Sequence, residues 1–157
     1  MTVPDITAPG AFSTAVKNVT AILHLASPYH FKIEKSEELL IPAREGTLNV
    51  LRSAAKEPSV KRVVITSSFA AMNQLGTDPY AQPPKKYDET VWNPVTWEEA
   101  LSGPPTMAYQ ASKKFAELAA YGKSLKISLI DSRICEGGET RVQCYHNMSP
   151  NGLWASS

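Results

Sequence analysis

The stretch "VKRVVITSS", residues 60–68, decides the fold class of this chain. It is a run of β-branched residues that ends in small hydroxyl residues, which predicts a β-strand. A second apolar run, "VTAILHLA" at 19–26, precedes it and is stopped by Ser27-Pro28 too early for a helix. We expect this earlier strand to be buried on both faces of a parallel sheet.

The segment between the two strands, residues 36–57, predicts the helix that connects them. Ser36 is a candidate N-cap, Pro42 predicts a kink or a later helix start, and Pro58 ends the element. Strand, helix and strand at this spacing indicate a right-handed βαβ crossover. One face of the helix collects apolar and small residues at three- and four-residue spacing: Leu40, Ala43, Thr47, Val50 and Ala54.

The second half of the chain is less regular. Residues 73–106 are rich in proline, glycine and polar side chains and predict a long loop, with one helical turn where Thr96 and Glu99 form a capping box. A helix is expected over 106–122. The stretch "LKISLI" at 125–130 is a candidate strand, and the remaining tail shows no period.

Composition excludes several classes of function. The chain has 157 residues, 43% hydrophobic and 20% charged, with a net charge of +1. This balance predicts one globular domain and gives no electrostatic reason to expect nucleic acid or an anionic membrane as partner. No apolar run approaches the ~20 residues that span a bilayer, and the first residues lack a signal-peptide pattern, so we expect a cytoplasmic protein. Cys135 and Cys144 are expected to be free thiols, and no metal site is predicted.

The stretch "AYQASKK", residues 108–114, places Tyr109 four residues before Lys113 on one side of the expected helix. Such a pair is common by chance, and without its context it indicates only two surface residues on a helix. Its surroundings are more specific, because parallel sheets bind ligands at the carboxyl ends of their strands. Ser68 lies at one such end, "HLASP" follows the neighbouring strand, and the Tyr109 helix is expected to face the same crevice.

Taken together, six stretches resemble the extended short-chain dehydrogenase/reductases, and within them the fungal NADPH-dependent aldehyde and ketone reductases, relatives of dihydroflavonol and cinnamoyl reductases. The resemblance covers about residues 3–121. It implies an α/β fold: a partial Rossmann-type parallel sheet with flanking helices over 1–121, followed by a divergent, poorly ordered tail over 122–157. The stretches are "DITAPGAF", "ILHLASPYHF", "LLIPAREGTLNVLRSA", "VKRVVITSSFAAM", "YDETVWNPVTWEEA" and "AYQASKKFAELAA".

By resemblance, the chain is an oxidoreductase that reduces a small aldehyde or ketone to an alcohol with NADPH. This reaction places a proton on the carbonyl oxygen as hydride reaches the carbon. Tyr109 is the implied proton donor. Lys113 is the implied partner that favours its phenolate form and binds the nicotinamide ribose. Ser68, rather than its neighbour Ser67, is implied to bind the substrate carbonyl.

The resemblance also assigns a cofactor site. Asp5 and Ile6 are matched to the adenine, and Thr66 to the strand end near the nicotinamide. Phe31 and Phe69 line the implied substrate pocket, with plain core packing as the alternative, and His24 is expected to be a satisfied core histidine. The implied cofactor-binding residues are Asp5, Ile6, Leu25, Ala26, Ser27, Pro28, Thr66, Tyr109 and Lys113.

The sequence departs from the family pattern at both ends. It has no G-x-x-G-x-x-G turn to approach the pyrophosphate, and its resemblance starts after the first two βα units. The resemblance stops near Tyr121, and the family's C-terminal substrate domain is not matched. A frame change, a retained intron or an alternative exon would produce such an abrupt loss of the pattern. NADP rather than NAD is therefore implied by the family alone. Two alternatives stay open: a sugar-nucleotide epimerase or dehydratase, and a non-catalytic remnant or gene-model fragment.

Overall fold

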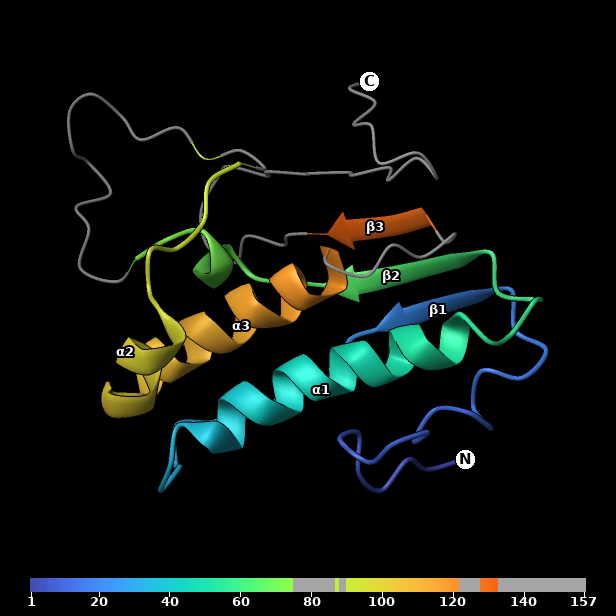
Figure 1. Cartoon of the computed structure of the whole chain (residues 1–157), viewed down its shortest axis with the longest axis horizontal. Coiled ribbons are helices and arrows are strands. Elements are labelled where there is room, and N and C mark those ends of the chain that lie inside the picture. Colours follow the sequence, from blue (N-terminus) through green and yellow to red (C-terminus); the bar gives the residue numbers. More distant parts are fainter. Residues whose placement is uncertain (75–86, 88–89, 122–127, 133–157) are drawn as a thin grey trace.

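The computed structural model describes residues 1–74, 87, 90–121 and 128–132. Within these ranges the three strands are parallel and lie in the order β1-β2-β3 (Figure 1). The predicted α/β class with a parallel sheet is confirmed. The elements, in chain order, are β1 (Ala21–His24), α1 (Glu37–Ala54), β2 (Arg62–Thr66), the 3-10 turn η1 (Phe69–Ala71), α2 (Trp97–Ser102), α3 (Pro105–Tyr121) and β3 (Ser128–Ser132).

The first two strands form the predicted βαβ unit. β1 pairs in parallel with β2, from Ala21 opposite Arg62 to His24 opposite Ile65, and α1 connects them. β3 pairs with the other edge of β2, so the candidate strand at 125–130 is found at 128–132. The other residues of the expected tail lie outside the described ranges. β2 is therefore the central strand of the three.

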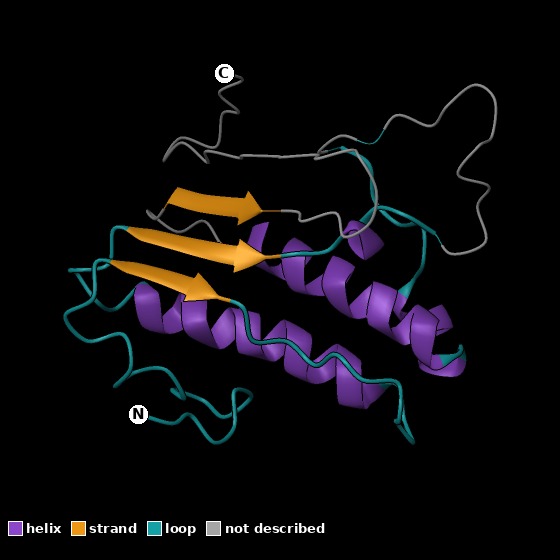
Figure 2. Ribbon diagram, turned by 180° about the vertical axis from the view of Figure 1, so that it is seen from behind, coloured by secondary structure: helices purple, strands orange, loops and turns teal. Residues whose placement is uncertain are grey.

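Both long helices lie on the same face of the sheet, as the two opposite views show (Figures 1 and 2). Val63 and Ile65 point into this layer and are buried, whereas Leu23 on β1 is 67% exposed. No described helix covers the opposite face. The predicted burial of the first strand on both faces is therefore wrong for the described residues, because its alternate side chains meet a helix layer on one side only.

The core consists of two apolar clusters between the sheet and the helices. The first joins the end of α1 to β2 and α3, and the second joins the start of α1 to α2 and α3. The buried members of the first are Val50, Leu51, Ala54, Val60, Val63, Ile65 and Ala120, and those of the second are Leu40, Val95, Ala100 and Ala111.

The helix starts only partly follow the sequence prediction. α1 runs unbroken through Pro42, so the predicted later start is wrong. One lost hydrogen bond is offset because Leu39 and Leu40, in the first turn, are fully buried. Ser36 makes no side-chain cap; the Glu38 carboxylate instead accepts hydrogen bonds from two preceding backbone N–H groups. The capping box predicted at α2 is confirmed.

The N-terminal segment is tied to α1 by one buried amide. Asn49 Nδ2 donates to the backbone oxygens of Ile6, Thr7 and Ala8 at 3.0, 2.9 and 3.1 Å. An amide nitrogen carries two hydrogens, so at least one is shared between acceptors. Gly46, one turn earlier, gives the Ile6 side chain room to approach the helix, since a Cβ at this glycine would lie 2.7 Å from Ile6 Cδ1.

Replacing Asn49 with alanine is expected to destabilise the chain by about 2 kcal/mol, because buried carbonyl oxygens lose their donor. A thermal melt measures the effect, with exposed Lys56→Ala, in the turn that follows α1, as the control. A melting temperature that moved no more than in the control would mean that Asn49 does not hold the N-terminal segment in place.

Candidate active site

A small polar cavity lies where β1 and β2 end. Its volume is about 20 Å³. Residues from both strand ends, from α1 and from α3 form its wall, so four separate parts of the chain meet there. The lining residues are His24, Ala26, Ser27, Thr47, Thr66, Ser67, Lys113, Ala116 and Glu117. The structure thus brings together four residues that the sequence assigned to one site: Ala26, Ser27, Thr66 and Lys113.

One stripe of α3 faces this region. Tyr109, Lys113 and Glu117 are spaced four residues apart, which places them on one side of the helix. Lys113 Nζ lies 5.8 Å from the centroid of the Tyr109 ring. Burial lowers the pKa of Lys113 from its usual value, since removal from water disfavours the ammonium form. A partly buried cation therefore lies next to the candidate proton donor.

Aromatic side chains surround Tyr109. Its ring meets Tyr29 at 5.2 Å and Phe31 at 5.9 Å between centroids, both edge to face. Tyr29 is 71% exposed and Phe31 is 45% exposed, so the cluster forms an open aromatic wall. Sequence reasoning found Phe31 but missed Tyr29, which lies two residues earlier in the same loop. Phe69, also predicted to line this pocket, packs against Tyr87 at 4.8 Å.

The two neighbouring serines have different environments. Ser67 is buried, and its Oγ donates to Glu117 Oε2 at 2.5 Å. Ser68 is half-buried and begins η1, where its Oγ accepts a hydrogen bond from the Ala70 backbone N–H at 3.2 Å. Ser67 therefore joins the end of β2 to α3. The Ser68 hydroxyl hydrogen has no acceptor among the described residues.

Glu117 was not singled out from the sequence, although it continues the spacing of Tyr109 and Lys113. Replacing Glu117 with alanine is expected to destabilise the chain by about 2 kcal/mol, because the buried Ser67 hydroxyl loses its acceptor. Glu117→Gln keeps an acceptor oxygen and is expected to lose less. Urea unfolding of the three proteins measures this order. Equal stability of the alanine and glutamine variants would show that the bond to Ser67 contributes nothing.

His24 is the second unexpected feature of the cavity. It is only 5% exposed, and burial together with the nearby charge of Lys113 lowers its pKa to about 4. Among the described residues, His24 Nε2 and Ser27 Oγ are buried without a hydrogen-bond partner. Within the described residues no protein group satisfies His24 Nε2, so the expectation of a satisfied core histidine is not met by the chain itself. Mid-strand position alone could not reveal this, since satisfaction depends on the neighbouring elements.

The remaining predicted cofactor residues lie away from the cavity wall. Asp5 is exposed, and its Oδ1 accepts two hydrogen bonds from Thr7, which lower the pKa of the Asp5 carboxyl. Ile6 packs against α1. Leu25 is 66% exposed, and Pro28 is half-buried on the segment that leaves β1. None of the four lines the cavity, and these contacts of Asp5 and Ile6 are made with Thr7 and Gly46 of the chain itself.

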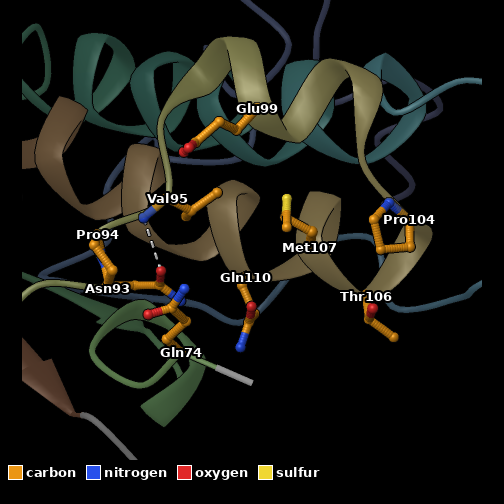
Figure 3. A pocket seen from close by; sticks show the side chains of 9 residues that line it. All are labelled: Gln74, Asn93, Pro94, Val95, Glu99, Pro104, Thr106, Met107 and Gln110. Carbon is orange, nitrogen blue, oxygen red and sulfur yellow. Dashed lines mark hydrogen bonds between the residues drawn. The ribbon is translucent and has the colours of Figure 1, made fainter. Parts of the chain in front are cut away.

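A larger cavity of about 310 Å³ lies elsewhere, between the segment before α2 and the start of α3 (Figure 3). None of the predicted site residues lines it. Several of its polar groups serve internal bonds: Asn93 Oδ1 accepts from the Val95 N–H, and Gln110 Nε2 donates to the Asn73 carbonyl. The unpartnered atoms and the buried ammonium belong to the smaller cavity, which we therefore take as the candidate site.

Two further classes of site are absent from the described part of the chain. No three His, Cys, Asp or Glu side chains gather there in a group that could hold a metal ion. None of the helices described combines the length and hydropathy required to cross a membrane. Cys135 and Cys144 lie outside the described residues.

Comparison with known proteins gives consistent matches. A family model described as "Male sterility protein", an NAD-binding family, matches residues 8–130. The NADPH-dependent methylglyoxal reductase of Saccharomyces cerevisiae is 43% identical over 126 residues, covering 76% of this chain and 36% of the relative. A ketoreductase of Aspergillus niger is 44% identical over 124 residues, covering 76% and 35%.

Solved structures agree with these sequence matches. The yeast methylglyoxal/isovaleraldehyde reductase complexed with NADPH superposes with a TM-score of 0.77 at 38% identity, covering 86% of this chain and 42% of that chain. The chain spans about 36% of the length of the curated relatives that it matches. The predicted Rossmann-type resemblance is confirmed at the level of the fold.

Proposed function

This chain belongs to the NAD-binding family described as "Male sterility protein", of the short-chain dehydrogenase/reductase type, and we propose that it takes part in NADPH-dependent reduction of a small aldehyde or ketone. Relatives named as NADPH-dependent reductases support the cofactor and the reaction class. The observation that carries the proposal is the position of Lys113, which lies in the cavity wall at the carboxyl ends of two parallel strands with the Tyr109 ring 5.8 Å from its Nζ. Parallel α/β sheets bind ligands at this edge.

In this proposal Tyr109 supplies the proton. A phenol is a weak acid at neutral pH, so it needs a neighbour that stabilises the phenolate left behind. The Lys113 ammonium is placed to do this, because it lies beside the ring in a partly buried environment where charges interact more strongly than in water. Ser68 is the proposed donor to the carbonyl oxygen, since its hydroxyl hydrogen is uncommitted among the described residues.

Several residues around the cavity fit the nicotinamide end of NADPH, which would bind outside this small space. When bound, NADPH supplies the hydride. Lys113 and Tyr109 would offer an ammonium and a hydroxyl to its ribose, and Thr66 and Ala26, at the ends of two parallel strands, would contact the cofactor there. The unpartnered Ser27 Oγ fits a polar ligand or water at this position. The assignments of Asp5 and Ile6 to the adenine, and of Leu25 and Pro28 to the phosphates, remain predictions.

The open aromatic wall favours an apolar carbonyl substrate. Tyr29 and Phe31 expose apolar ring surface beside Tyr109, and burying such surface on binding is favourable. Their edge-to-face contacts with the Tyr109 ring also fix the direction of its hydroxyl. A substrate held on this wall would present its carbonyl group near the phenol.

The test is a thermal melt of the purified 157-residue chain with and without saturating NADPH. A ligand that binds only the folded state raises the melting temperature, so a clear upward shift is expected. Lys113→Gln is expected to reduce this shift, because it removes the charge that meets the ribose. A melt that NADPH does not move would overturn the proposal for this chain and favour a non-catalytic remnant.

A further inference from the structure

The cavity lined by Lys113 contains two buried polar atoms whose hydrogen bonds are not satisfied by other described residues. His24 Nε2 and Ser27 Oγ are both buried, and neither has a hydrogen-bond partner among the described residues. Buried polar atoms in folded proteins are nearly always paired with protein groups or with ordered water. The His24 ring cannot form this hydrogen bond with bulk water, because His24 is 95% buried in the layer between β1 and the helices. We therefore expect the cavity to hold a further molecule that forms hydrogen bonds with both atoms.

The dimensions of the cavity identify that partner. Its volume of about 20 Å³ exceeds the ~10–15 Å³ that one water molecule needs, and leaves no room for a larger ligand. The wall supplies two to four polar partners, as a buried water requires. A metal cation is disfavoured, because the Lys113 ammonium already lines the same small space.

We propose that this cavity holds one structural water, which joins His24 and Ser27 to Lys113 and makes His24 a positioning residue for Lys113. The water oxygen accepts a hydrogen bond from Lys113 Nζ. Its two hydrogens are donated to His24 Nε2 and Ser27 Oγ. This arrangement requires a neutral His24 with its proton on Nδ1. The role at Tyr109 rests on the proposed function, whereas the water site does not.

The water matters because Lys113 Nζ makes no hydrogen bond to another of the described residues. An ammonium has three N–H donors and no acceptor, so burial is tolerated only where oxygen or nitrogen lone pairs surround it. A water fixed by the strand end of β1 offers such a lone pair. It would hold Nζ in place beside the Tyr109 ring and support its charged form.

The first test is a crystal structure of the wild-type chain. We expect an ordered water within hydrogen-bond distance of His24 Nε2, Ser27 Oγ and Lys113 Nζ. An empty cavity, or one filled by a side chain, would overturn the proposal. This measurement needs no variant and no catalytic activity.

The second test measures the pKa of Lys113 through the pH dependence of its acylation by an N-hydroxysuccinimide ester, read by mass spectrometry. His24→Leu removes one water partner and Ser27→Ala removes the other. Each is expected to raise the neutral fraction of Lys113 at fixed pH by about tenfold, a change of about one pKa unit. His24→Gln keeps a polar atom near the Nε2 position and is expected to restore wild-type reactivity.

The variants also allow the proposed water site and the proposed function to be tested independently. If His24→Leu does not fold, Ser27→Ala removes only one oxygen and gives the same readout. Unchanged Lys113 reactivity in the folded variants would overturn the positioning role. Failure of NADPH to bind would contradict the proposed function, yet leave the crystallographic water and the Lys113 reactivity as expected.

Discussion

Replacing Tyr109 with phenylalanine is expected to lower NADPH-dependent carbonyl reduction by at least ~100-fold, which corresponds to about 2.7 kcal/mol of transition-state stabilisation. Phenylalanine keeps the ring that packs against Tyr29 and Phe31, so the aromatic wall is preserved. Only the hydroxyl is lost. Without it, the developing charge on the carbonyl oxygen has no positioned proton donor.

Loss of NADPH absorbance with methylglyoxal or isovaleraldehyde as probe measures the rate. Tyr121→Phe is the matched control: it lies on the same helix, packs against Trp92 through its ring, and has no place in the proposed chemistry. The control is expected to keep the wild-type rate. A Tyr109→Phe protein that reduced the probes as fast as this control would rule out Tyr109 as the proton donor.

The melting-temperature shift with NADPH separates chemistry from binding. Tyr109→Phe keeps Lys113 and the strand ends, so it is expected to retain most of the cofactor-induced shift. A variant that lost both turnover and the shift would indicate that the hydroxyl serves binding rather than proton transfer. This distinction follows the general rule that an interaction made only in the transition state lowers the rate without weakening ground-state binding.

Local pattern in the sequence predicted the elements well. The β-branched run at 60–68 and the apolar run at 19–26 became β2 and β1, because strand formation depends on short-range side-chain shape and on the breakers that end each run. The capping box at Thr96 was predicted correctly for the same reason, since both partners lie within one turn. Parallel pairing followed from the length of the connecting helix.

The features that were predicted wrongly or missed depend on residues distant in the sequence. Burial on both faces of β1 was predicted from hydrophobicity, yet Leu23 is exposed because no described helix lies over that side. The tie between Ser67 and Glu117 joins residues 50 positions apart, and no local pattern marks it. Pro42 was given too much weight, since tertiary packing of α1 outweighs the loss of one helical hydrogen bond.

In the candidate site, too, features set by local sequence were predicted and features set by distant neighbours were not. The Tyr109 and Lys113 pair was found from helical spacing, and the structure places Lys113 in one cavity wall with Ala26, Ser27 and Thr66. Resemblance supplied what spacing could not, namely the roles of these residues. The unpartnered His24 escaped both kinds of reasoning, because a hydrogen-bond deficit becomes visible only when every surrounding element is in place.

His24 should also make the stability of the chain depend on pH in a window where few other groups titrate. Its pKa falls from the usual 6.5 of histidine to about 4 in the folded chain, first because burial disfavours the charged ring and second because Lys113 repels it. The unfolded chain therefore binds a proton more readily than the folded chain between these values. Stability is fully present above pH ~6.5 and declines as the pH falls toward ~4.

The difference between 6.5 and about 4 corresponds to about 3 kcal/mol. Lys113 and Glu117 are the other titratable groups in the cavity wall. Hydrogen bonds from Thr7 and Thr96 lower the pKa of the exposed carboxyls of Asp5 and Glu99, which lie outside the cavity wall. Urea unfolding across the window is expected to show the decline in the wild-type chain and its loss in His24→Gln, whose side chain does not titrate. Parallel curves for the two proteins would mean that His24 is protonated as easily in the folded chain as in the unfolded one, and that the cavity leaves its ring in contact with bulk solvent.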